Sequence, residues 1–306
     1  MRPTSRLTSH QSRKFIKRKK ARGLIVGVLA VVSIASGLFV LSKLSSLYAL
    51  SIQTVEVRGA DNDLVGPIQM ATLGALEGKY LHLFSKSNTF IYPRDLVSSV
   101  VGSVSPRISS VEVKKSGMHT LGIFVEEKAP KALVCANLPE FNGDNLSLEN
   151  LDSCYFADTM GYIFASAPLF SGNVYNRYYA PDLSNTTSTE NSVIGSYATS
   201  SAEFTRLQEF YEGARLFGVD VLAILIKEAG EYELYARNSI QDQIVATSSA
   251  NAMVVYFNDS RPFRDQLVNL FSFWTKMKDQ ARSKGEGVNF DYIDVRYGSN
   301  VFYRTI

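Results

Sequence analysis

The longest hydrophobic pattern of the chain lies near its start, where residues 23–42 contain no charged side chain. At about 1.5 Å of rise per residue, twenty helical residues reach across the roughly 30 Å hydrocarbon core of a bilayer. The pattern therefore predicts one transmembrane helix over residues 23–42.

The residues before this segment decide its orientation. Residues 1–22 hold nine Lys/Arg and no acid, and only Lys43 follows closely. Because basic flanks stay in the cytoplasm, we expect a basic cytoplasmic tail and an extracytoplasmic remainder. A cleaved signal peptide shares this layout, but its apolar core is only about 7–15 residues and ends at small residues. Here Leu47 occupies the small-residue position before Ala49, which favours the uncleaved anchor.

A second pattern, alternation with period two, begins at Ile52 and ends at Gly59. It predicts a half-buried strand with Val55 and Val57 on one face. Two short helical patterns and two more alternating segments follow, the last pair joined by a turn at residues 116–117. In order, the five segments are residues 52–58, 65–73, 93 onward, 108–113 and 121–125. Two helices can then cover one face of a three-stranded sheet, in a small domain over residues 50–128.

After Pro130 the pattern changes to longer strands and two amphipathic helices, which indicates a second domain over residues 130–306. Ser200 and Glu203 form a capping box that opens the first helix. The second helix begins near Pro262, and its apolar stripe is predicted to be core: Phe263, Leu267, Leu270, Phe271 and Trp274. Strands are predicted at residues 219–226, 232–236, 253–257, 290–297 and 301–304, and an exposed polar loop at 184–199. The predicted class is α+β, with a larger, mostly antiparallel β-rich domain.

Charge narrows the choice of partners. Without the nine basic residues of the tail, 23 Lys/Arg stand against 29 Asp/Glu, so the outer portion carries about −6. The positive charge is a juxtamembrane patch suited to anionic lipid. We therefore expect no nucleic-acid partner.

The chain has two cysteines, Cys135 and Cys154, and both lie on the oxidising side in the predicted topology. They stand in short apolar strands joined by a polar loop, a layout in which neighbouring antiparallel strands can face one another. We favour a disulfide between them; two free buried thiols are the alternative.

Residues suited to catalysis are scarce. The three histidines, His10, His82 and His119, have no catalytic neighbours in sequence, and nucleophile-elbow, zinc-helix and phosphate-loop motifs are missing from the sequence. The acid pairs Glu126–Glu127 and Asp291–Asp294 point to opposite faces of a strand, so neither converges as an acid and base must. We predict no enzyme, no cofactor, no metal site and no small-molecule substrate.

The chain ends in a strand that follows a bend at residues 298–300. A terminal strand often lies at a sheet edge, where it can accept a strand from another chain. Its aromatic residues suit an interface, although they can also simply close the domain core.

Taken together, these segments resemble the FtsQ/DivIB family of bacterial division proteins. The resemblance rests on the order of the elements and on residues 55–59, Gly78 with 83–84, 108–113, 121–132, 155–164 and 292–297. The segment 121–132 looks like the end of a polypeptide-transport-associated (POTRA) domain, and 292–297 is similar to the family's C-terminal strand motif.

The resemblance implies a non-enzymatic, single-pass scaffold of the cytoplasmic membrane, found at the division septum. It implies partners resembling FtsB and FtsL and a link to septal peptidoglycan synthesis, with the septal synthase as a further expected partner. The partner strand is expected at the last edge, formed by Tyr297, Ser299, Val301, Phe302 and Tyr303. Arg296 is expected to meet an acidic residue of the partner.

Two other function classes stay open. The first is an envelope scaffold of another assembly pathway, which would use the same small domain as a docking surface. The second is a membrane-anchored cell-wall enzyme, which would need convergent acids or a nucleophile that the sequence does not reveal.

Overall fold

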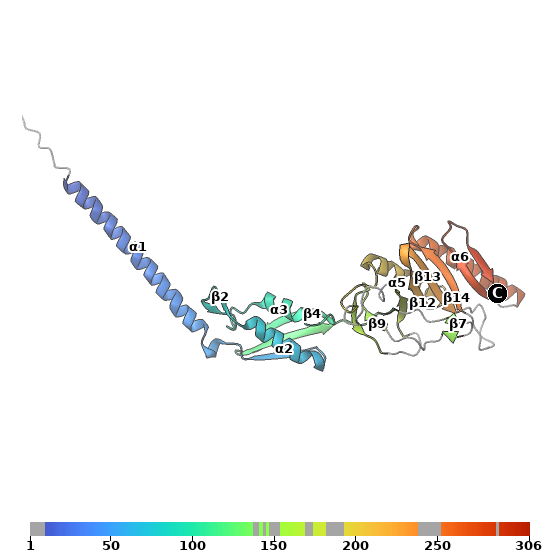
Figure 1. Ribbon diagram of the computed structural model, residues 1–306, viewed down its shortest axis with the longest axis horizontal. Coiled ribbons are helices and arrows are strands. Elements are labelled where there is room, and N and C mark those ends of the chain that lie inside the picture. Colours follow the sequence, from blue (N-terminus) through green and yellow to red (C-terminus); the bar gives the residue numbers. More distant parts are fainter. Residues whose placement is uncertain are drawn as a thin grey trace, which may run out of the picture. The chain divides into compact units, whose positions relative to one another are not determined.

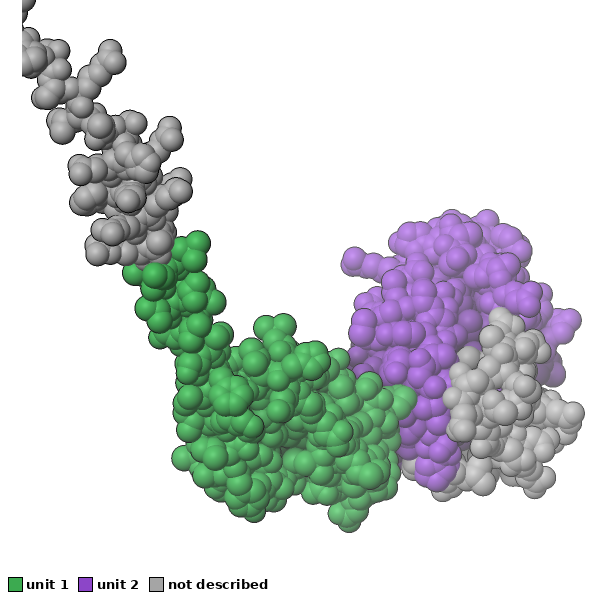
Figure 2. Space-filling model, turned by 60° about the vertical axis from the view of Figure 1, so that its left-hand side comes forward, with its two compact units in different colours: residues 1–127 green, residues 128–306 purple. Residues whose placement is uncertain are grey.

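The computed structural model describes residues 10–136, 141–142, 145–146, 154–168, 174–181, 193–237, 252–285 and 288–306. The chain divides into two compact units, residues 1–127 and 128–306, which Figure 2 draws in green and purple. The fold is α+β: one long N-terminal helix precedes a small α+β unit and a larger, sheet-rich unit.

The N-terminal helix, α1 (His10–Ser45), contains the apolar segment expected from the sequence. Its stretch Leu24–Ser45 covers 22 residues with a mean hydropathy of 2.7. The most apolar part of this stretch is exposed throughout. By length and composition it can cross a membrane. The helix extends three residues past the predicted end at Ser42 and includes Lys43.

The first unit repeats the predicted order of strand, helix, helix, strand and strand, with a small hairpin added between the helices (Figure 1). After a 3₁₀ turn (Tyr48–Leu50), its elements are β1 (Thr54–Arg58), α2 (Asn62–Leu76), β2 (Lys79–Tyr80), β3 (Phe84–Ser85), α3 (Arg94–Gly102), β4 (Ile108–Lys115) and β5 (Thr120–Glu127). Helix α2 begins three residues before the predicted start at Val65 and tolerates Pro67 inside it. Its added last turn buries Ala75 and Leu76 in the unit's core.

The three main strands lie in the order β1-β5-β4, with β1 parallel and β4 antiparallel to β5. The alternation of β1 places Val55 in the core, where it joins Ile68 of α2 and Val97 of α3. Gly59, directly after β1, has φ +85°, and a Cβ built on it would lie 2.2 Å from the carbonyl oxygen of Val125. Only glycine fits this position, since the backbone of β5 passes where a side chain would be.

We expect Gly59→Ala to destabilise the first unit more than Gly78→Ala does. Both residues have a left-handed backbone conformation, with φ +85° and +86°, but a Cβ added to Gly78 would point into open space. The backbone penalty alone costs about 1 kcal/mol at either site, and the clash at Gly59 adds to it. Hydrogen exchange of peptides from residues 54–127 measures the difference. Equal losses of protection in the two variants would contradict the close approach of Val125.

The second unit is built on a sheet of nine strands within the described part of the chain, in the order β10-β9-β6-β11-β12-β13-β14-β15-β16. The strands are β6 (Ala132–Cys135), β9 (Cys154–Ala157), β10 (Ile163–Ser166), β11 (Asn176–Tyr179), β12 (Asp220–Ile226), β13 (Glu231–Arg237), β14 (Ala252–Asn258), β15 (Phe290–Asp294) and β16 (Phe302–Thr305). A separate hairpin pairs β7 (Phe141–Asn142) with β8 (Asn145–Leu146). Three neighbouring pairs are parallel, β6–β11, β11–β12 and β14–β15, and the other five are antiparallel.

Two helices, α5 (Ser201–Leu216) and α6 (Phe263–Lys284), pack their apolar faces into the main core of this unit (Figure 1). The predicted capping box is present: the Ser200 side chain accepts a hydrogen bond from the backbone N–H of Glu203. Leu270 and Trp274 of α6 are buried as expected. The prediction for Phe271 was wrong, since its side chain is 40% exposed. It lies at the margin of the stripe and packs only sideways on Phe217, at a ring distance of 4.3 Å.

Strand β12 is buried on both faces, as its nearly continuous apolar sequence predicted. Val221 and Ile224 join the core under the helices, whereas Leu222 and Leu225 join a smaller cluster on the other face. The predicted loop at 184–199 falls largely outside the described residues; within the part that is described, Val193 is buried in the main core.

Cys135 and Cys154 form a disulfide across the antiparallel pair β6–β9, where they are direct register partners with a Cα–Cα distance of 4.1 Å. Cys135 is almost fully buried, at 1% exposed. The bond closes a chain segment of 19 residues, most of which the described residues omit.

Replacing both cysteines by alanine should lower the free energy of unfolding of the second unit by about 3 kcal/mol, because a loop of this size is no longer closed in the unfolded chain. Chemical denaturation followed by the emission of Trp274, the single tryptophan of the sequence, measures this. The oxidised wild type is the control. An unchanged midpoint would mean that the bond does not constrain the unfolded chain.

Candidate functional site: the C-terminal sheet edge

The last strand, β16, lies at one edge of the nine-stranded sheet and pairs only with β15 among the described strands. All four of its residues are exposed. Sheet edges carry backbone N–H and C=O groups without a ladder partner, which is the feature that recruits further strands. This edge is therefore the first candidate for a contact with another chain.

The register of the sheet places successive side chains of β16 on different faces. Phe302 lies opposite Asp294, which lies opposite Tyr256 of β14. Tyr303 lies opposite Ile293, which lies opposite Val255. Ile293 and Val255 belong to the core under the helices. Phe302 and Tyr303 thus belong to opposite faces of the sheet.

Tyr303 is 48% exposed, but its ring packs at the margin of the core. Its ring lies 4.9 Å from that of Phe273 on α6 and 5.9 Å from that of Phe290. Phe302 instead packs edge-on against Tyr297 at 5.8 Å, and the two rings are 51% and 57% exposed. The sequence left open whether these aromatics close the core or form an interface; in the structure Tyr303 packs on core rings, whereas Phe302 and Tyr297 pack on each other.

The face that carries Phe302 is lined by rings and arginines close to the edge. We call it the aromatic edge face and define it by Tyr256, Tyr292, Arg296, Tyr297, Phe302 and Arg304. Tyr256 and Tyr292 lie 5.9 Å apart. The guanidinium of Arg296 stacks on Tyr256 and Tyr297, at 5.2 and 5.4 Å, and that of Arg304 stacks on Tyr292 at 5.3 Å. Such ring and guanidinium contacts are enriched at protein interfaces.

Arg296 is paired within the chain. Its guanidinium donates to both carboxylate oxygens of Asp294, at 2.9 and 2.6 Å, and to Glu231 at 2.8 Å. The hydrogen bonds to Asp294 raise the pKa of Arg296 further, and Glu231 adds to the effect. Arg296 therefore ties the end of β15 to the start of β13, and its expected contact with an acidic residue of a partner stays a prediction.

The bend between β15 and β16 is held by the second amphipathic helix. The carbonyl of Gly298 accepts hydrogen bonds from Arg261 and from Asn269, both at 2.6 Å. Gly298 has φ +65°, as a tight bend requires. Ser299 is exposed in this bend, and Val301 packs at the margin of the main core. Sequence reasoning missed Arg261 and Asn269, because the contact spans about thirty residues and leaves no local signal.

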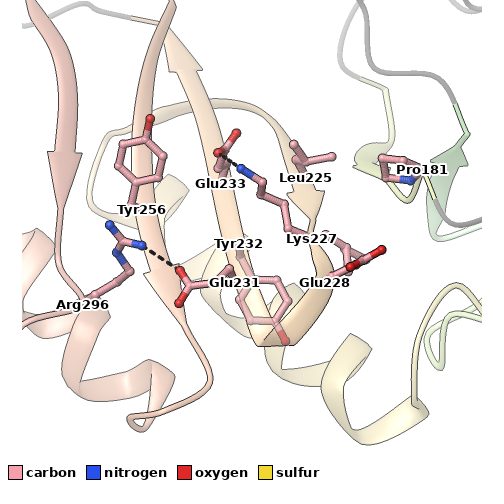
Figure 3. Close-up of a pocket in the computed structure, with 10 residues that line it drawn as sticks. Pro181, Leu225, Lys227, Glu228, Glu231, Tyr232, Glu233, Tyr256 and Arg296 are labelled. Atoms are coloured by element: carbon pink, nitrogen blue, oxygen red, sulfur yellow. Dashed lines mark hydrogen bonds and ion pairs between the residues drawn. The ribbon is translucent and has the colours of Figure 1, made fainter.

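A pocket of about 620 Å³ opens beside the aromatic edge face (Figure 3). Its lining includes Tyr256 and Arg296 with the tip of the β12–β13 hairpin. Lys227 donates to Glu233 at 2.6 Å, and the dashed lines of Figure 3 mark this pair and the Arg296–Glu231 pair. Each of the two bases of the lining thus pairs with an acid, and Glu228 is a third acid of the lining.

The acidic pairs of the sequence are separated in space. Glu127 pairs with Arg107 at 2.7 Å, whereas Glu126 accepts from Ser110. Asp291 pairs with Arg304, and Asp294 pairs with Arg296. The described residues contain no group of three metal-ligating side chains. His119 lies near the start of β1, where its Nδ1 is 3.0 Å from the carbonyl oxygen of Ser51.

Comparison with known proteins leaves this chain without an assigned family. No family model matches it, and no curated protein matches it.

We expect Tyr303→Ala to lower the free energy of unfolding of the second unit by about 1–2 kcal/mol, since it removes a ring packed on Phe273 and Phe290. Phe302→Ala should change it by less than about 0.5 kcal/mol, as is usual for exposed positions. Denaturation curves read from Trp274, which lies 6.2 Å from Phe290, measure both. A larger loss for Phe302→Ala would place Phe302 in the core instead.

Proposed function

We propose that this chain is a single-pass membrane scaffold that binds a partner protein through the edge strand β16 and the aromatic edge face. The carrying observation is an edge strand that presents an exposed ring pair, Tyr297 and Phe302, on a rigid sheet. Backbone pairing along β16 would supply affinity, and the two rings would supply anchors.

The rigidity of this edge supports the proposal. Arg296 clamps β15 to β13, and Arg261 and Asn269 clamp the bend at Gly298. An edge that is already ordered loses little conformational entropy when a partner strand is added. The contacts inside the unit therefore favour binding without a change of fold.

The N-terminal helix supports an anchored location. Its apolar stretch is long enough to cross a bilayer, and the basic flank of residues 1–22 favours an orientation with that tail in the cytoplasm. The part of the first unit that follows α1 and the whole second unit would then lie outside the cytoplasm, where the disulfide Cys135–Cys154 is chemically stable.

We further propose that the scaffold acts in bacterial cell division, in the manner of the FtsQ/DivIB family. The strand-helix-helix-strand-strand order of the first unit supports this proposal because it resembles that of a POTRA domain, and the terminal edge strand β16 supports it because such an edge can accept a partner strand. On this proposal the partners resemble FtsB and FtsL, the chain gathers at the septum of the cytoplasmic membrane, and it links them to peptidoglycan synthesis. No catalytic step is assigned to it.

The test is capture of partners from membrane extract with the full chain as bait, compared with Phe302→Ala and with the double variant Tyr297→Ala/Phe302→Ala. Loss of a central aromatic anchor typically weakens binding at least about tenfold. We expect the wild type to capture small single-helix, coiled-coil membrane proteins, identified by mass, and the double variant to lose them.

Tyr197→Ala is the matched control. Tyr197 is also half-exposed and packs edge-on against another ring, Tyr162 at 5.2 Å, but it lies next to β10 at the other edge of the sheet. It should retain full capture. Equal capture by all variants would move the binding site away from β16. Capture of unrelated proteins by the wild type would refute the division role.

A further inference from the structure

The end of α1 is hydrogen-bonded to the hairpin β2–β3 inside the first unit. The hydroxyl of Ser42 donates to the carbonyl of Leu83. The backbone N–H of Ser85 donates to the hydroxyl of Ser45 at 3.1 Å, and the side-chain amide of Asn88 donates to the carbonyl of Ser45 at 3.0 Å. Ser45 is buried by these contacts, at 8% exposed, although the apolar turns before it are open.

These hydrogen bonds show how the hairpin runs along α1. Ser85 is hydrogen-bonded to Ser45, whereas Leu83 is hydrogen-bonded to Ser42, which lies almost one helical turn closer to the centre of the apolar segment. Going from β3 towards the tip of the hairpin therefore leads towards the apolar segment. The tip itself consists of Leu81, His82 and Leu83.

The tip exposes a large apolar side chain on a residue whose backbone conformation is energetically unfavourable. Leu81 is 86% exposed, and both Leu81 and His82 have positive φ, at 47° and 62°. Left-handed φ is uncommon for a bulky residue such as leucine, and the backbone strain it costs is often found at functional positions. Glycine or asparagine would form the same turn at lower cost. In water, the exposed leucine adds nothing to the stability of this turn.

The surroundings of the tip have the composition of a membrane interface. Leu44, Leu47 and Tyr48, at the end of α1 and just after it, are 46%, 47% and 77% exposed. Lys43 directly precedes Leu44, and Lys79 of β2 lies two residues before Leu81. Tyrosine and lysine are typical of the zone between lipid headgroups and water.

We propose that the tip of the β2–β3 hairpin inserts into the outer leaflet of the bilayer that α1 crosses, with Leu81 among the acyl chains and Lys43 and Lys79 at anionic headgroups. The inference rests on the membrane-spanning role of α1 in the proposed function. It adds a second point of attachment, so that the first unit has a fixed orientation against the membrane. An aqueous partner protein at Leu81 is the competing occupant.

The experiment places an environment-sensitive fluorophore on Leu81→Cys in the full chain, reconstituted at one copy per nanodisc of phosphatidylcholine and phosphatidylglycerol in equal amounts. The two native cysteines are bonded to each other, so the new thiol alone reacts. His82→Cys serves as a second labelled site in the same turn. We expect blue-shifted emission at both sites, with stronger quenching by lipids that carry a nitroxide on the acyl chain.

Two controls calibrate the depth. Phe39→Cys lies in the apolar stretch of α1, and Asn62→Cys lies in the first turn of α2, at the opposite end of the sheet. Lipid nitroxides should quench the label at residue 81 several-fold more than the label at residue 62. Quenching at 39 but not at 81 or 82 overturns the hairpin proposal and leaves the membrane helix intact.

The remaining outcomes are equally decisive. Lack of quenching at residue 39 overturns the membrane-spanning helix, and the hairpin proposal with it. A blue shift at 81 without lipid quenching means that the tip is covered by protein, which overturns insertion into lipid.

Discussion

The backbone register between β15 and β16 is the constraint on which the candidate site depends. Ile293 opposite Tyr303 and Asp294 opposite Phe302 assign one ring to the core and the next ring to the aromatic edge face. A slip of one residue would exchange them, since side chains alternate between the faces of a strand. The register is supported by the ion pair of Arg296 with Glu231 of β13 and by the hydrogen bonds from Arg261 and Asn269 to the carbonyl of Gly298.

The charged side chains near the C-terminal edge of the second unit form ion pairs within the chain. Asp294 is 7% exposed, and burying a carboxylate without a partner is costly. The bidentate contact with Arg296 removes that cost and places the guanidinium between two rings. The same residue therefore satisfies a buried acid, joins two strands and shapes the aromatic edge face. Arginine suits this arrangement because its planar group can pair and stack at once.

The first unit shows a comparable link between a helix and a sheet. Serine and asparagine side chains join the end of α1 to the β2–β3 hairpin, so the apolar segment is connected to the folded unit by specific hydrogen bonds. Because a serine at a helix end can bond either its own backbone or a neighbouring segment, the choice depends on what the fold brings near it.

Local patterns were enough to predict most elements of this protein but not their contacts. The apolar run of α1, the alternation of β1 and the capping box at Ser200 each depend on neighbours in sequence, so they were readable without a structure. The exposure of Phe271 and the internal pairing of Arg296 depend on which segments meet across the sheet. The sequence by itself determined the α+β class, the apolar N-terminal helix and a terminal strand rich in aromatics. Only the tertiary structure decided that β16 is an edge and that Tyr303, not Phe302, takes the face that carries the core, because strand order and register arise from contacts between residues far apart in the chain.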